Sequence, residues 1–304
     1  MPCRTRIRPS NLLRSAPDPL PAREALRLLR ETLTAPAGSA QAAAQEAEWL
    51  LAFVMGWPRS RLWSHGETAL TPEQRERLDQ FAERRLAGEP VAYVLGATGF
   101  HDLTLTVTPD TLIPRPETER LVEIALTLAI PAPRVADLGT GSGAIALALA
   151  AARPEWDVYA VDRSAAALAV AGTNARRLGL MDRVRFIAGD WCAPLAPETF
   201  GLIVANPPYL ADTDPHLPEL RHEPRGALVA GPTGLEDLAH IIDTARDVLM
   251  PGGWLVLEHG WDQGPAVREL LSAAGYRAVS GHQDFAGHDR VALGRHEPEP
   301  EDTA

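Results

Sequence analysis

The four residues Asn206-Pro207-Pro208-Tyr209 bring together a side-chain amide, two rigid backbone units and an aromatic ring. A planar amide or aniline-like nitrogen is a poor nucleophile because its lone pair is delocalised. If the Asn206 side-chain oxygen and the Pro207 carbonyl each accept one N–H, the lone pair is held toward an electrophile, and such orientation lowers a barrier substantially. The prolines stiffen the loop, and Tyr209 can stack on a flat substrate or a sulfonium cation. The loop predicts an acceptor site in which Asn206, Pro207, Pro208 and Tyr209 bind substrate, with Asn206 and Pro207 catalytic.

A glycine-rich loop at residues 137–143, Asp-Leu-Gly-Thr-Gly-Ser-Gly, follows an expected strand and opens an expected helix. Its glycines allow a tight turn, a close ligand and close packing of helix on strand. Dinucleotide enzymes use a similar loop, but this one lacks the spacing that brings a helix N-terminus onto a pyrophosphate. S-adenosylmethionine (SAM) has no phosphate, so the loop predicts SAM contacts at Gly139, Thr140, Gly141, Ser142 and Gly143.

Three further positions complete the predicted cofactor site. Asp162 ends the next strand, where a carboxylate can accept hydrogen bonds from ribose hydroxyls; its alternative role is a helix cap or a surface acid. Asp190 and Trp191 follow the third strand, where they offer an acceptor for the adenine amino group and an apolar wall. Their alternative is a loop acid beside a ring packed on the sheet edge. Asn206 is expected to touch the cofactor as well as the substrate.

The elements that position these residues form a regular alternation of strands and helices. We expect strands at 134–138, 158–161, 184–188, 202–205 and 254–258, helices at 143–152 and 165–178, and a closing antiparallel pair at 276–280 and 290–293. Strands that alternate with helices of this length indicate a parallel, doubly wound α/β sheet. In such sheets ligands bind at the carboxyl ends of the strands, which is where the motifs lie.

A helical region precedes the sheet. Apolar stripes predict helices at 21–34 and 39–55, and a capping box at Thr71 and Gln74 starts a third that ends near Gly88. Short amphipathic helices of this kind form a small bundle, predicted over residues 20–88. The alternation of Val91, Tyr93 and Val94, and then of 103–107, predicts a β-hairpin connector over 89–116.

Composition narrows the function. The 304 residues carry a net charge of −11, so bulk nucleic-acid binding is not expected. No apolar run reaches membrane-spanning length. The cysteines, Cys3 and Cys192, form neither a disulfide framework nor a metal-ligand pattern, which fits a reducing cytoplasm. Residues 1–19, which are rich in arginine, predict a disordered leader, and the Glu/Pro-rich residues 297–304 predict a disordered acidic tail.

From about residue 90 to 295 the chain resembles the HemK/PrmC family, the protein-(glutamine-N5) methyltransferases of peptide chain release factors. The likeness is carried by 113–119 (Ile-Pro-Arg-Pro-Glu-Thr-Glu), 137–143, 206–209, and Leu257-Glu258-His259-Gly260 with Gln263. It implies a Rossmann-like class I SAM-dependent methyltransferase domain, here 117–296, behind a substrate-docking helical domain. It also implies that the glutamine of the Gly-Gly-Gln loop of class I release factors is the acceptor, that S-adenosylhomocysteine is the product, and that no metal takes part.

Other functions remain open at this point. Residues 221–224, Arg-His-Glu-Pro, resemble sister enzymes that methylate a glutamine of a large-subunit ribosomal protein, whereas 116–119 and 258–260 resemble the release-factor branch. The acceptor loop also serves planar base nitrogens in DNA and rRNA, but such enzymes must extrude a base and usually need a basic region. An NAD-dependent oxidoreductase leaves 206–209 unexplained. A non-catalytic SAM-binding module has no use for an intact acceptor loop.

Overall fold

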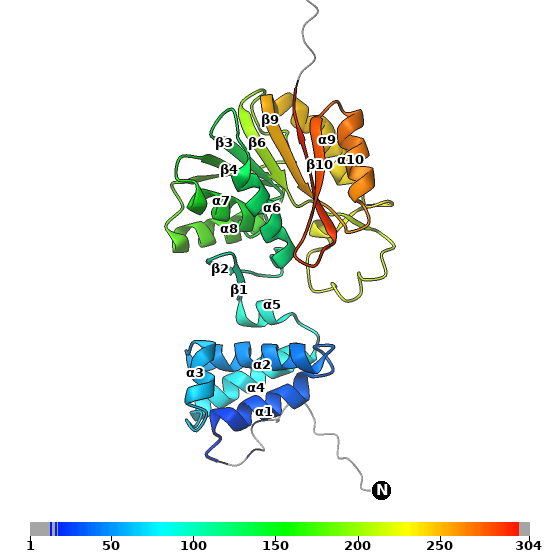
Figure 1. Ribbon diagram of the computed structural model, residues 1–304. Helices are drawn as coiled ribbons and strands as arrows, with labels where there is room; N and C mark the ends of the chain where they lie inside the picture. The colour runs from blue at the N-terminus through cyan, green and yellow to red at the C-terminus, as the bar shows by residue number, and fades with distance from the viewer. Residues whose placement is uncertain (1–12, 14–15, 17, 298–304) are drawn as a thin grey trace, which may run out of the picture. The chain divides into compact units, whose positions relative to one another are not determined.

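The computed structural model describes Leu13, Ala16 and residues 18–297, which divide into two compact units, Met1–Gly96 and Ala97–Ala304 (Figure 1). Most of the predicted leader and tail lies outside the described residues. Within the leader range, however, Leu13 is fully buried in the core of the first unit, and its N–H donates to Asp79 Oδ1 at 2.8 Å. Among these residues no helix is long and apolar enough to cross a membrane.

The first unit is helical, as predicted, but has more helices than the sequence analysis found. They are α1 (Ala22–Leu33), α2 (Ala40–Met55), α3 (Arg59–Ser64), α4 (Pro72–Leu86) and α5 (Val91–Leu95). The capping box is confirmed, because the Thr71 hydroxyl accepts from Gln74 N–H and the Gln74 side chain accepts from Thr71 N–H. Leucines on the predicted stripes, such as Leu29, Leu50 and Leu78, are fully buried.

The strand predicted from Val91, Tyr93 and Val94 is wrong, since these residues form α5. Three apolar residues within four positions fit a helical period as well as a period of two. Gly96 then ends the helix in a left-handed conformation at φ 71°, a geometry that glycine adopts without strain. Val91 and Val94 pack into the core of the bundle, so this segment belongs to the first unit.

The second unit contains a seven-stranded sheet in the order β10-β11-β9-β6-β3-β4-β5. Its strands are β3 (Arg134–Leu138), β4 (Asp157–Asp162), β5 (Val184–Ala188), β6 (Phe200–Ala205), β9 (Leu249–Glu258), β10 (Arg277–Gln283) and β11 (Asp289–Arg295). The first five run parallel, and β10 and β11 are antiparallel to their neighbours, which confirms the predicted α/β class and the closing pair.

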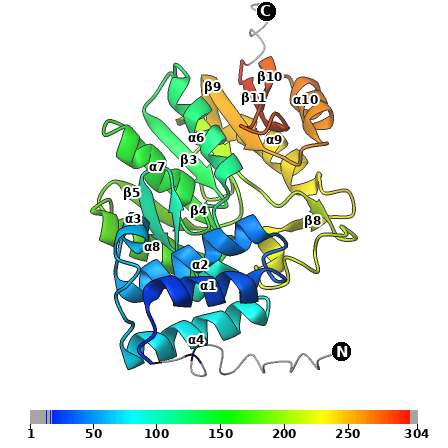
Figure 2. The same cartoon turned by 60° about the horizontal axis from the view of Figure 1, so that its bottom comes forward.

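Helices cover both faces of this sheet (Figures 1 and 2). They are α6 (Pro116–Thr127), α7 (Ala144–Ala152), α8 (Ala165–Leu178), α9 (Glu236–Val248) and α10 (Gly264–Ala273). Alternate residues of one strand enter different cores: Leu202 of β6 packs with α6 and α7, whereas Ile203 packs with α9 and α10. This alternation follows from the period of two in a strand and makes the sheet doubly wound.

Two small strand pairs complete the second unit. The hairpin of β1 (Ala97–Phe100) and β2 (Leu103–Thr106) is antiparallel, and Asn174 of α8 bonds both backbone groups of Thr106. Strands β7 (Leu210–Ala211) and β8 (Val229–Gly231) pair in parallel on either side of an excursion over residues 212–228, which includes the short 3-10 helix η2 (Arg225–Ala227). The excursion therefore starts just after the acceptor loop, and β8 at its far end pairs with the short strand that follows this loop.

Candidate active site

The predicted motifs meet at one edge of the sheet. Leu138 of β3 pairs with both Val161 of β4 and Ala205 of β6, so the residues that follow these strands emerge side by side. They open onto a solvent-connected pocket that encloses about 790 Å³ of empty space, part of it open solvent. Of the residues predicted for the site, those that line this pocket are Gly139, Gly141, Asp162, Asp190, Trp191, Asn206 and Pro208.

Thr140, Ser142 and Gly143 are not in the wall of this pocket; they build the loop behind it. The Thr140 hydroxyl donates to Asp137 Oδ2 at 2.6 Å, and Ala146 N–H donates to the same oxygen at 3.1 Å. Asp137 is fully buried, and burial raises its pKa to about 7. The buried acid thus ties the strand, the loop and the first turn of α7 together, a role that the sequence analysis did not assign to it.

Gly143 is the N-cap of α7, at a point where α7 and α8 pack closely. Its φ is +85°, and a Cβ at this position would lie 3.0 Å from Leu147 Cδ1 and 3.2 Å from Ala171 Cβ. Any larger residue would be both strained and crowded. The sequence predicts that this glycine lets helix and strand pack, but its nearest neighbours belong to the helices α7 and α8.

Asp162 supports the glycine loop as well as facing the pocket. Its Oδ2 accepts from Gly141 N–H and its Oδ1 from Ser164 N–H, each at 2.8 Å. An ionised carboxylate offers about four acceptor positions, so each oxygen retains capacity for a ligand hydroxyl. The cap of α8 is Ser164 rather than Asp162, because the Ser164 hydroxyl accepts from Ala167 N–H.

Trp191 packs against the glycine loop and also lines the pocket. A Cβ on Gly139 would lie 3.1 Å from Trp191 Cζ3, so the ring covers the loop backbone. The residue has φ +44°, which is unusual for a bulky side chain, and its side chain is buried. Asp190 beside it is exposed at the rim. The two alternatives weighed for Trp191, a packed ring and a pocket wall, are therefore compatible.

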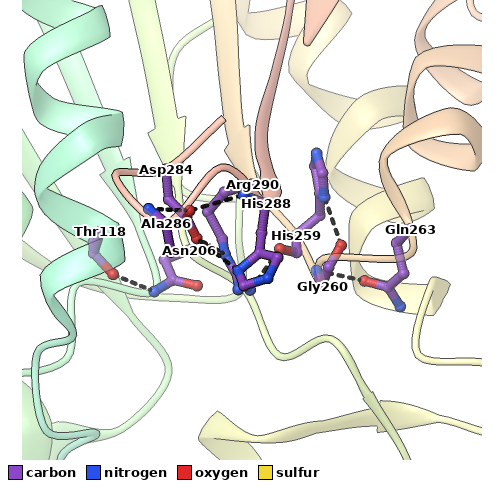
Figure 3. Close-up of polar contacts among 9 residues, drawn as sticks. All are labelled: Thr118, Asn206, His259, Gly260, Gln263, Asp284, Ala286, His288 and Arg290. Atoms are coloured by element: carbon purple, nitrogen blue, oxygen red, sulfur yellow. Dashed lines mark hydrogen bonds and ion pairs between the residues drawn. The ribbon is translucent and has the colours of Figure 1, made fainter. Parts of the chain in front are cut away.

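Asn206 stands where two pockets meet. A second pocket, with about 630 Å³ of empty space, shares Asn206 with the first and is lined by Pro207, Tyr209 and mainly apolar neighbours. The Asn206 Nδ2 donates to Thr118 Oγ1 at 3.1 Å (Figure 3). Its Oδ1 is buried and has no hydrogen-bond partner among the described residues. Asn206 thus lines both pockets and carries a buried acceptor that no described residue uses.

Several residues that hold this arrangement carried no assigned role in the sequence analysis. Gln263 Nε2 donates to the Tyr209 carbonyl at 3.0 Å, and its Oε1 accepts from Gly260 N–H at 2.8 Å. The buried Glu223 accepts from Ile113 N–H at 3.0 Å and pairs with Arg115, so it joins the excursion to the segment before α6. Gln263 and Glu223 could have been found only through the recognisable segments that contain them, because Tyr209, Ile113 and Arg115, to which they bond, are distant in sequence.

The turn between β10 and β11 is held by Asp284, and the strand that follows it is tied to the residue after β9 (Figure 3). Asp284 Oδ1 accepts from the N–H groups of Ala286 and His288, and Arg290 Nη1 donates to the His259 carbonyl at 3.2 Å. His259 is fully buried, and burial lowers its pKa. The neutral ring donates from Nδ1 to the Gly260 carbonyl at 2.8 Å, so His259 has a structural partner and is not poised as a charged group.

Two family models match the chain: the PrmC N-terminal domain over residues 24–96 and the methyltransferase small domain over 118–220. A release factor glutamine methyltransferase from Salmonella typhimurium is 49% identical over 257 residues, which are 84% of this chain and 92% of that protein. One from Pseudomonas aeruginosa is 51% identical over 253 residues, 82% and 91% of the two chains. The chain belongs to the release factor glutamine methyltransferase family.

Membership confirms the resemblance and makes this chain a methyltransferase. The relatives carry the name of the release-factor branch, although residues 221–224 resemble the sister enzymes. Among solved structures, a methyltransferase from Pyrococcus furiosus is similar, with a TM-score of 0.51 and 18% identity, covering 71% of this chain and 98% of that one. At this identity the likeness concerns the fold alone.

Proposed function

We propose that this methyltransferase transfers the methyl group of SAM to the side-chain amide nitrogen, N5, of the glutamine in the Gly-Gly-Gln loop of class I peptide chain release factors. The observation that carries the proposal is the position of Asn206, which lines both pockets and whose buried Oδ1 has no partner among the described residues. An acceptor there can hold an amide N–H from one pocket against a methyl donor in the other. The names of the relatives support the choice of substrate.

The first pocket suits SAM in the chemistry of its walls. Asp162 offers carboxylate positions for ribose hydroxyls, Trp191 offers an apolar face, and Asp190 offers an acceptor at the rim. When bound, SAM supplies a methyl group on a sulfonium, which is already a good leaving group, so no metal is required. Among the described residues no group of three or more His, Cys, Asp or Glu is placed to hold one.

The second pocket suits the glutamine. We infer that Asn206 Oδ1 and the Pro207 carbonyl each accept one of the two amide N–H groups, which turns the nitrogen lone pair toward the methyl group. With SAM bound, the nitrogen would form its bond to the methyl carbon as the C–S bond breaks, and one amide proton would pass to water, which leaves the neutral N-methyl amide and S-adenosylhomocysteine. Holding the nucleophile at the reacting distance replaces the entropy cost of a free encounter.

The helical unit, which was predicted as 20–88 and extends to Gly96, is proposed to dock the protein substrate, and the unit that begins at Ala97 is proposed to carry out catalysis. A separate PrmC N-terminal domain match, which also ends at residue 96, supports the division. The low cysteine content and the buried free Cys192 support a cytoplasmic location. The acidic net charge of −11 supports a protein partner rather than nucleic acid or a membrane.

The test is incubation of the protein with tritiated SAM and, separately, a class I release factor, a large-subunit ribosomal protein, or oligonucleotides. We expect label in the release factor, located by mass spectrometry at the glutamine of the Gly-Gly-Gln loop, and none in a factor whose glutamine is replaced by alanine. Label in the ribosomal protein or the oligonucleotides alone would assign the enzyme to another substrate class.

A further inference from the structure

Two segments that carry the family resemblance, 116–119 and 257–260, meet next to Asn206. Ala205 at the end of β6 pairs with Leu257 of β9, so the next residues, Asn206 and Glu258, lie side by side at the ends of neighbouring strands. Thr118 lies in the first turn of α6 and points toward Asn206 (Figure 3). Both Thr118 and Glu258 are buried, with 3% and 1% of their surface exposed. Neither Thr118 nor Glu258 is among the residues proposed to contact SAM.

The direction of the Asn206 amide decides whether it can hold a substrate N–H. Its oxygen is an acceptor and its nitrogen a donor, so a flipped amide would set two donors against each other. In the structure Nδ2 donates to Thr118 Oγ1 at 3.1 Å, which leaves Oδ1 free. This arrangement requires the Thr118 oxygen to act as an acceptor, and its own hydroxyl proton must therefore point elsewhere.

Glu258 is the acceptor available for that proton. Its carboxylate is enclosed, and neither oxygen meets the geometry of a full hydrogen bond among the residues that the structure describes. Asn206 and Glu258 each follow the registered pair Ala205–Leu257, so they lie side by side at the sheet edge, where Asn206 also bonds Thr118. The Thr118 hydroxyl lowers the pKa of Glu258 because it favours the charged form. A hydroxyl rotates to suit its partner and an ionised carboxylate accepts only, so the Thr118 proton can turn to Glu258.

We propose that Glu258 is a positioning residue that fixes the direction of hydrogen bonding through Thr118 to Asn206. An ionised Glu258 draws the Thr118 proton, the Thr118 oxygen accepts from Asn206 Nδ2, and Asn206 Oδ1 is directed at the substrate amide. A protonated Glu258 becomes a donor to Thr118, whose proton then turns to Asn206 and favours the flipped, unproductive amide. The inference rests on the proposed function, since it assigns how the acceptor site is kept in order.

The charges around Glu258 bear on when it is ionised. Burial raises its pKa to about 7, while Thr118, Arg290 of β11 and Arg115 before α6 act to lower it. Glu117 acts to raise it, and Tyr209 of the acceptor loop also faces it. The neighbouring His259 is kept neutral by burial. The ionised, productive form therefore gains population as the pH rises through about 7.

The experiment compares Thr118→Val, which removes the hydroxyl at nearly constant shape, with Thr118→Ser, which keeps it. Single-turnover transfer from SAM to a release factor is measured beside a SAM binding titration. We expect Thr118→Val to lower the transfer rate by roughly 10²-fold, the scale of a misplaced reacting group, with SAM affinity near that of the wild type. Thr118→Ser should restore most of the rate.

A second arm follows the rate of the wild type and of Glu258→Gln across the pH range around 7. The wild-type rate should rise through this range, whereas the rate of the Gln variant, which cannot ionise, should be nearly independent of pH. The inference would be overturned if Thr118→Val transferred the methyl group at the wild-type rate, or if Glu258→Gln kept the wild-type pH profile. In either case an active wild type would still support the proposed function. An inactive wild type would instead count against the function. If Glu258→Gln does not fold, the Thr118 pair decides.

Discussion

Replacing Asp162 by alanine should weaken SAM binding and also loosen the glycine loop. The carboxylate accepts from Gly141 N–H and Ser164 N–H at 2.8 Å each and is proposed to accept from the ribose as well. Hydrogen bonds to a charged group contribute about 1.5–3 kcal/mol. At 1.4 kcal/mol per factor of ten, Asp162→Ala should raise the Kd for SAM by roughly 10- to 150-fold.

Part of this loss has a structural origin, which a control variant can separate. Asp190→Ala removes an acid from the rim of the same pocket, where the structure describes no hydrogen bond of its carboxylate. Titration calorimetry should give a much smaller loss of SAM affinity for Asp190→Ala than for Asp162→Ala. Without SAM, urea unfolding should show Asp162→Ala less stable by about 1–3 kcal/mol, since two backbone donors lose their acceptor. Unchanged SAM affinity in a folded Asp162→Ala protein would refute the reasoning.

Three further predictions concern the loop and the two units. Gly143→Ala should lower the free energy of unfolding by more than the roughly 1–2 kcal/mol that a left-handed conformation costs a non-glycine residue. Gly179 has φ +69° but no atom within 4 Å of a Cβ, so Gly179→Ala should lower the free energy of unfolding by that cost alone. Equal losses in urea titrations of the two variants would contradict the packing role of Gly143. Burial raises the pKa of Asp137 from 3.8 to about 7, so ionisation of this acid destabilises the folded state. The free energy of unfolding of the wild type, relative to that of Asp137→Asn, should therefore fall as the pH rises from about 4 to about 7. A difference in melting temperature between the two proteins that does not vary with pH would contradict this. A truncated protein that begins at Ala97 should bind SAM but methylate intact release factor poorly, and full activity on the intact factor would reject the docking role of the bundle.

The sheet could be predicted because its determinants are local. The runs at 134–138 and 184–188 have the bounds of β3 and β5, since a buried strand is specified by its own apolar residues. Residues 91–95 show the limit of this approach, because a short apolar run fits two periods and the packing of the bundle decides between them. Helices α9 and α10 were not predicted, since no motif singled out their segments.

The acceptor loop and the glycine loop could be assigned to one site because both follow strands of a parallel sheet. What no local pattern gives is the partner of each polar group. Thr118 and Asn206 are 88 positions apart, and Arg115 and Glu223 are 108 apart. These pairs depend on where α6 packs and how β6 and β9 are registered, so they emerge only once the chain is folded.

The central claim, that Asn206 orients the amide for methyl transfer, is tested most directly by single-turnover transfer to a release factor with SAM binding measured on the same protein. Asn206→Ala should lower the rate by roughly 10²-fold or more, the scale of a lost positioned group, while SAM affinity falls much less. Asn206→Asp should bind SAM at least as well, through its added negative charge, without restoring the rate. Transfer near the wild-type rate by a folded, SAM-bound Asn206→Ala protein would contradict the account.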